Sequence, residues 1–60
     1  MTVRDLYIYS KDEQIFILFM DGETEPCFRG DLEHCPTKLI DRLIYQFQAI
    51  DFNTIVVVLQ

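Results

Sequence analysis

The sequence predicts an α+β fold: a small ββ(β)αβ domain whose three- or four-stranded sheet carries one helix on one face. Residues 15–20 (IFILFM) and 55–59 (IVVVL) are continuous apolar runs of strand length. Residues 37–50 place apolar side chains at helical spacing. A strand with one wet face alternates between apolar and polar residues, so the two runs indicate strands that are apolar on both faces.

The N-terminal part of the chain predicts two strands. Residues 2–10 are rich in aromatic and β-branched side chains, which favour a strand. Two pairs of side chains would lie on opposite faces of it: Leu6 with Ile8, and Tyr7 with Tyr9. A polar break of hairpin length follows at residues 11–13, and residues 14–20 form the second predicted strand.

The middle of the chain predicts a turn and a short edge strand. Asp21-Gly22 is a strong turn signal, because glycine reaches positive φ without a steric penalty. Residues 24–29 could return as a third strand, which belongs at the sheet edge since Pro26 cannot donate to a ladder. Residues 30–35 predict a loop.

A single amphipathic helix is predicted over residues 37–50, with Pro36 or Thr37 at its start. Its apolar arc would cover one sheet face with Leu39, Ile40, Leu43, Ile44, Phe47 and Ile50. Residues 51–53 then form a turn. Residues 54–60 form the last strand, which is predicted at the centre of the sheet, beside residues 2–10, because both its faces are apolar.

One helix covers one face of a sheet, so the other face is predicted to be the interface with a partner. The side chains expected on it are Tyr7, Tyr9, Phe16, Leu18 and Met20. Burial of such a face favours a homodimer, through the sheet face or its edge, or a complex with another protein. The alternative is a monomer in which the loop over residues 23–35 covers this face.

The charge balance narrows the class of partner. Ten acidic and five basic residues give a net charge of −5, whereas nucleic-acid binders carry a basic stripe. We therefore expect no direct nucleic-acid binding and a basic protein surface as partner. The partner-binding acidic rim is predicted to comprise Asp12, Glu13, Asp21, Glu23 and Glu25. Asp31 and Glu33 would lie near the first two and Asp51 near the others, and Tyr45 is a predicted aromatic anchor on the wet side of the helix.

The residue types that carry chemistry are few. Cys27, His34 and Cys35 offer three ligands, but a structural zinc needs four, and adjacent His and Cys are poorly spaced. The sequence contains no phosphate-binding loop, dinucleotide fingerprint or zincin helix. We expect no catalytic residue, no metal and no cofactor, and both cysteines to pack as small apolar side chains. The protein is predicted not to be an enzyme.

Neither a membrane-spanning run nor a signal peptide is apparent, so a cytoplasmic single domain over residues 1–60 is expected. In size, acidity and strand–helix content the chain resembles small phage-encoded inhibitors of uracil-DNA glycosylase and of nucleases. The resemblance involves no shared motif and assigns no residue. It implies a non-enzymatic protein that binds and inhibits or modulates a larger, nucleic-acid-processing protein. The alternative is a structural, oligomerising subunit or assembly factor.

Overall fold

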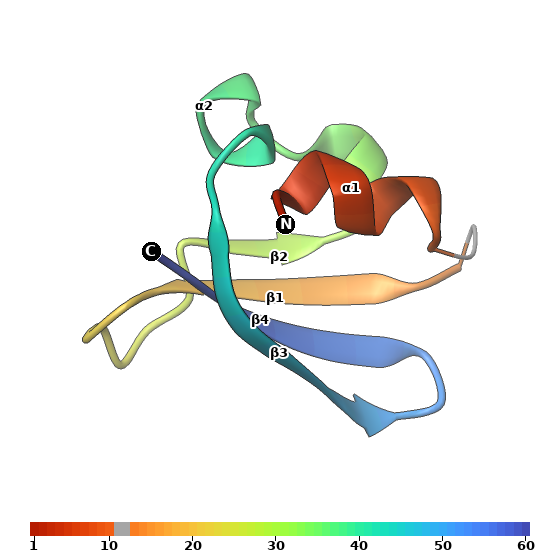
Figure 1. Cartoon of the computed structure of the whole chain (residues 1–60). Coiled ribbons are helices and arrows are strands. Elements are labelled where there is room, and N and C mark those ends of the chain that lie inside the picture. The colour runs from red at the N-terminus through yellow and green to blue at the C-terminus, as the bar shows by residue number, and fades with distance from the viewer. Residues whose placement is uncertain (11–12) are drawn as a thin grey trace.

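The computed structural model describes residues 1–10 and 13–60 and has an α+β fold built on a four-stranded mixed sheet (Figure 1). In chain order its elements are α1 (Val3–Ile8), β1 (Ile15–Met20), β2 (Phe28–Gly30), the 3-10 helix η1 (Leu32–His34), α2 (Thr37–Ile40), β3 (Ile44–Asp51) and β4 (Thr54–Leu59). The strand order is β2-β1-β4-β3, with β1 and β4 parallel and both outer pairs antiparallel. The predicted fold class and the central place of the last strand are confirmed, although β4 lies beside β1 and not beside residues 2–10.

The segment predicted as the first strand is the helix α1. Thr2 caps it: the Thr2 hydroxyl accepts a hydrogen bond from the Asp5 amide, and the Asp5 carboxylate accepts one from the Thr2 amide at 2.9 Å. The bond from the Thr2 amide, together with one that the Thr2 hydroxyl donates to the same carboxylate at 3.1 Å, lowers the pKa of the Asp5 carboxyl. Val3 and Leu6, one turn apart, are buried against the sheet. The Thr-x-x-Asp spacing of a capping box was present in the sequence, but the aromatic content of the segment favoured the wrong interpretation.

The helix predicted over residues 37–50 is a single helical turn followed by a strand. Long-range contacts hold the residues after α2. The Arg4 guanidinium donates to the Asp41 carboxylate at 2.8 Å, and the Arg42 guanidinium donates to the Gln60 carbonyl at 2.9 Å. The chain then runs into β3, which is rich in β-branched and aromatic residues and pairs with β4. Residues 44–50 therefore form a strand despite their helical spacing, because they pair with the apolar strand β4.

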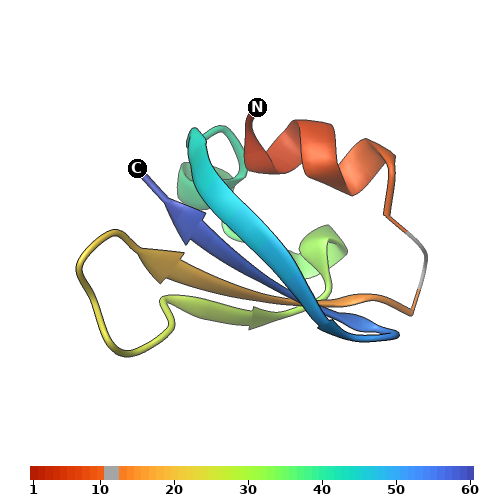
Figure 2. The same cartoon turned by 60° about the horizontal axis from the view of Figure 1, so that its bottom comes forward.

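All helical elements lie on one side of the sheet, as Figure 2 shows. The core consists of Val3, Leu6, Leu32, Leu39 and Ile40 from these elements, packed on Phe16, Leu18, Val57 and Leu59. The loop over residues 23–35 does not cover the second face. Its Leu32 lies in the core beneath the helices, and its Phe28 packs against the same core.

The two apolar sets of β1 occupy the opposite faces from those predicted. Phe16 and Leu18 are 1% and 0% exposed beneath the helices, and Met20 packs against the same core. Tyr7 and Tyr9, expected on the uncovered face, lie on α1 and at its C-terminal cap and are exposed. Both sets of β1 side chains are large and apolar, so the pattern alone could not tell which one the helices would cover.

The predicted turns are present. Gly22 has a φ of 86° in the loop after β1, a conformation that glycine adopts readily. A short edge strand is present as predicted, but β2 covers Phe28–Gly30 where residues 24–29 were expected, and it begins two residues after Pro26. Phe52 and Asn53 form the turn between β3 and β4, and the Ile15 amide donates to the Asn53 carbonyl at 2.7 Å. This hairpin therefore lies at the start of β1.

We predict that Thr2→Ala lowers the free energy of unfolding by about 1 kcal/mol, because the change removes the capping hydroxyl of α1. Urea denaturation followed by circular dichroism measures it. Thr24→Ala, a change of the same size in the exposed loop after β1, is the control and should leave the midpoint unchanged. Equal stability of wild type and Thr2→Ala would show that the cap does not stabilise the fold.

Candidate protein-interaction surface

The uncovered side of the sheet presents an apolar strip from its two central strands. We call this strip the open face: Ile15, Ile17 and Phe19 of β1 with Val56 and Val58 of β4. The parallel register places Ile17 beside Val56 and Phe19 beside Val58. Ile15 is 37% exposed and the other four side chains are partly exposed. The open face is thus the alternate set of the same two apolar runs, and the predicted set lies in the core.

Polar side chains border the open face on both outer strands. On β2, Arg29 pairs with Ile17 and is exposed. On β3, Gln46 and Gln48 lie beside the two valines of β4. A hollow of about 220 Å³ lies over this part of the sheet, lined by Gln46, Phe47, Gln48, Ile50, Val56 and Val58. An apolar centre with a polar border is the usual anatomy of a protein interface.

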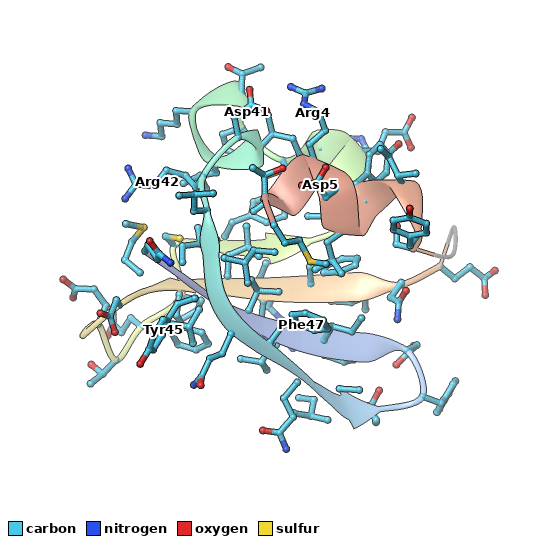
Figure 3. All side chains as sticks on the ribbon, in the orientation of Figure 1. Arg4, Asp5, Asp41, Arg42, Tyr45 and Phe47 are labelled. Atoms are coloured by element: carbon cyan, nitrogen blue, oxygen red, sulfur yellow. The ribbon has the colours of Figure 1, made fainter. Side chains whose placement is uncertain are left out.

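The strand β3 forms an exposed outer edge of the sheet. Seven of its eight residues are exposed. The side chains of Tyr45 and Phe47, which are 61% and 49% exposed, lie on opposite sides of the strand (Figure 3). Tyr45 was predicted as an anchor on a helix surface; it is exposed, but it belongs to this edge strand. Long exposed edges are sites where another strand can be added.

Acidic residues lie at both ends of the sheet. Asp21, Glu23 and Glu25 are exposed in the loop between β1 and β2. Glu13 is exposed before β1, whereas Asp12 lies outside the described residues. Asp51 was expected with the first group and is found at the opposite end, because the hairpin that follows β3 lies next to the start of β1.

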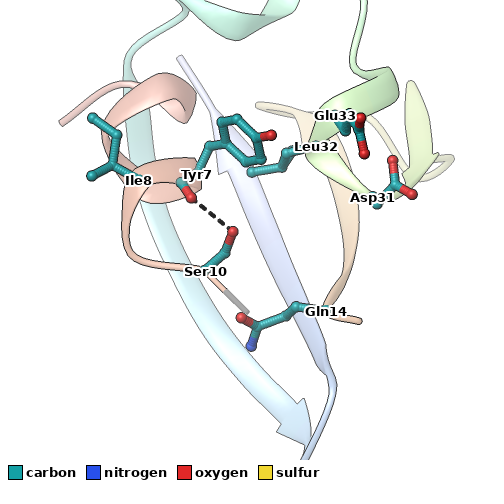
Figure 4. Close-up of a pocket in the computed structure, with 7 residues that line it drawn as sticks. All are labelled: Tyr7, Ile8, Ser10, Gln14, Asp31, Leu32 and Glu33. Carbon is teal, nitrogen blue, oxygen red and sulfur yellow. Dashed lines mark hydrogen bonds between the residues drawn. The ribbon is translucent and has the colours of Figure 1, made fainter. Parts of the chain in front are cut away.

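A polar pocket of about 390 Å³ opens between α1, the start of β1 and η1 (Figure 4). Its lining includes Tyr7, Ser10, Gln14, Asp31, Leu32 and Glu33. The Ser10 hydroxyl donates to the Tyr7 carbonyl at 2.8 Å. Among the described residues that line this pocket, the charged side chains are the two carboxylates of Asp31 and Glu33.

Asp31 is tied to His34. The Asp31 carboxylate caps η1 by accepting a hydrogen bond from the His34 amide, and it also contacts the His34 imidazole Nδ1 at 2.5 Å. This contact raises the pKa of His34 and lowers the pKa of Asp31. Both side chains are exposed to solvent.

The two thiols are free in the structure. The Cys27 thiol donates to the Leu18 carbonyl at 3.3 Å. Cys35 packs against the core, and burial raises the pKa of its thiol. Among the residues that the structure describes, no three His, Cys, Asp or Glu side chains are placed to hold a metal ion. No helix in the described ranges is long and apolar enough to cross a membrane.

Because the contact between Asp31 and His34 shifts both pKa values, we predict that its contribution to the stability of the fold depends on pH. Its stabilising effect through His34 is complete below the ordinary histidine pKa and is lost as the pH rises through the raised value in the folded chain. Its effect through Asp31 is present above the ordinary aspartate pKa and is lost as the pH falls through the lowered value. The pair should therefore stabilise the folded chain most in the weakly acidic range between the ordinary pKa of aspartate and the ordinary pKa of histidine.

We expect Asp31→Asn to return the pKa of His34 towards the ordinary histidine value, as measured by a proton NMR titration of the imidazole. Glu33→Gln is the matched control. Glu33 acts on His34 only through its charge and is the smallest of the causes, so this change should move the pKa less. An unchanged His34 pKa in Asp31→Asn would contradict the contact.

Comparison with known proteins finds no match to this chain among protein families, curated proteins or solved structures. The candidate surface is therefore defined by the geometry of residues 1–10 and 13–60, which have an apolar face without a cover, an unpaired strand edge and acidic groups at both ends of the sheet.

Proposed function

We propose that the protein is a non-enzymatic interaction module that forms a homodimer and binds and modulates a larger protein. The observation that supports this most strongly is the open face, whose five apolar side chains have no covering element in the described part of the chain. Fully burying one such side chain contributes roughly 1.5–3 kcal/mol. These side chains are already partly buried, so covering the strip with a partner would add only a fraction of that free energy at each side chain.

The acidity of the chain supports a basic surface as the partner. The loop that carries Asp21, Glu23 and Glu25 projects beyond the sheet in both ribbon views, so these carboxylates are free to meet a neighbouring surface (Figures 1 and 2). A basic surface that otherwise holds phosphate groups would be complementary to them. For this reason we propose a nucleic-acid-processing protein as the class of target, inhibited or modulated in the cytoplasm.

The second candidate function is that of a structural, oligomerising subunit without an inhibitory role. The exposed edge of β3 favours it, because such an edge can extend a sheet from one molecule to the next. The two functions differ in whether the chain binds a different protein at its open face or only copies of itself.

Self-association is tested by sedimentation equilibrium. We expect the mass of two chains at micromolar concentration. A single-chain mass that persists as the concentration rises would contradict the homodimer and leave a one-to-one complex with another protein.

Partner binding is tested by capture from an extract of the native host. The protein retained by the wild type should be lost with Phe19→Asp, because the change places a charge in the centre of the open face. Tyr9→Asp is the matched control: it introduces the same charge at an exposed aromatic residue of the helical side and should retain the partner.

Charge reversal separates the two contributions to that binding. Asp21→Lys with Glu23→Lys should weaken capture of the same protein and reduce its dependence on salt, since charges at the border of an interface act mainly on the association rate.

Equal capture by Phe19→Asp and the wild type would rule out the open face as the binding surface.

A further inference from the structure

We infer that the homodimer forms through the outer edges of two β3 strands, which pair antiparallel about a two-fold axis at Phe47. The two four-stranded sheets then join into one continuous sheet. The pairing deepens the proposed function, on which it rests, by naming the surface that holds the second copy.

The outer edge of β3 is available along most of its length. Its inner edge pairs with β4. Within the described residues, the outer edge is met only at its beginning, where the Ile44 amide donates to the Met1 carbonyl at 2.8 Å and Thr2 bridges Leu43. The backbone groups beyond Ile44 that point outwards have no partner strand. A second strand would satisfy them.

The sequence of β3 is nearly the same in both directions around Phe47. Residues 44–50 read Ile-Tyr-Gln-Phe-Gln-Ala-Ile, and only the Tyr45 and Ala49 positions differ on reversal. An antiparallel pair centred on Phe47 places the two phenyl rings opposite each other and Gln46 opposite Gln48. Aromatic pairs and amide pairs of this kind stabilise neighbouring antiparallel strands.

The bulges of β3 define how far the pairing extends. The register against β4 shifts between Ile44 and Gln46 and again between Ala49 and Asp51. Bulges bend a strand and commonly end its pairing. Between them residues 46–49 are in regular register, so the pairing with the second copy is expected to centre on residues 46–48 and to end before it reaches the Met1 carbonyl.

The charges of the chain do not oppose this contact. The net charge is −5, yet residues 44–50 contain no ionisable side chain except the phenol of Tyr45. Like charges placed directly opposite in a ladder destabilise it, and residues 44–50 contain no Asp, Glu, Lys, Arg or His. The outer edge of β2 is different, because it is only three residues long and carries Arg29 at its centre. The β3 edge is therefore the better surface for an identical strand.

The pairing also leaves the open face free. A two-fold axis perpendicular to the sheet keeps the open faces of both copies on the same side, where they form one longer apolar surface. The homodimer would therefore present the larger protein with two open faces and two acidic loops.

Site-directed cross-linking tests the pairing and its register. In a background with Cys27→Ser and Cys35→Ala, Phe47→Cys places one thiol directly opposite its copy. Opposite residues of antiparallel strands have Cα atoms about 4.5–5.5 Å apart, which suits a disulfide. Mild oxidation should convert most of this variant to a covalent two-chain species on a non-reducing gel.

Gln46→Cys is the matched control. Alone it should stay single-chain, because Gln46 faces Gln48 of the other copy, whereas a mixture of Gln46→Cys and Gln48→Cys chains should cross-link. This second pair keeps the test independent of how Phe47→Cys folds, and circular dichroism verifies the fold of each variant.

The possible results separate the edge pairing from the function on which it rests. A two-chain mass in sedimentation with no cross-link at residues 46–48 would overturn the edge pairing and leave the homodimer in place. If Phe19→Asp abolished that mass, the interface would be the open face. A single-chain mass with no cross-link would overturn both.

Discussion

The parallel pairing of β1 with β4 is the constraint on which the rest of the structure depends. Both strands are apolar on both faces, and their register places Phe16, Leu18 and Met20 level with Ile55, Val57 and Leu59 on one side. The short helices cover that side alone. Within residues 1–10 and 13–60 no helix covers the other side, so the same pairing that builds the core also leaves an apolar strip without a cover there.

Contacts between the N-terminal segment and residues 41–44 determine where the elements begin and end. The Val3 amide donates to the Arg42 carbonyl at 3.2 Å, and the ion pair between Arg4 and Asp41 lies next to it. These contacts end α2 after one turn and direct the chain into β3. They join parts of the chain that are about 40 residues apart, so the local spacing of residues in the sequence could not predict them.

This explains which parts of the fold could be predicted from the sequence. The two apolar runs, the turn at Gly22 and the edge strand near Pro26 depend on local chemistry, and they were predicted. Residues 37–50 fit one helix by spacing, but only Thr37–Ile40 are helical, and the strand Ile44–Asp51 pairs with β4 instead of continuing that helix. For the candidate surface, the existence of an uncovered face could be predicted, but not whether the odd- or even-numbered side chains of β1 form it, since both sets are equally apolar.

The open face and the β3 edge differ in the way they can hold a partner, and this difference supports the separate roles proposed for them. An edge offers backbone hydrogen bonds along a line, which an extended strand satisfies and which depend little on side chains. A sheet face offers apolar area without backbone groups, which a second surface covers regardless of its own secondary structure. One surface is an edge of the sheet and the other is a face of it, so a partner at the edge leaves the face accessible. In the proposed homodimer the chain therefore pairs with itself at the edge of the sheet, while the apolar side chains of the open face stay accessible to a different protein.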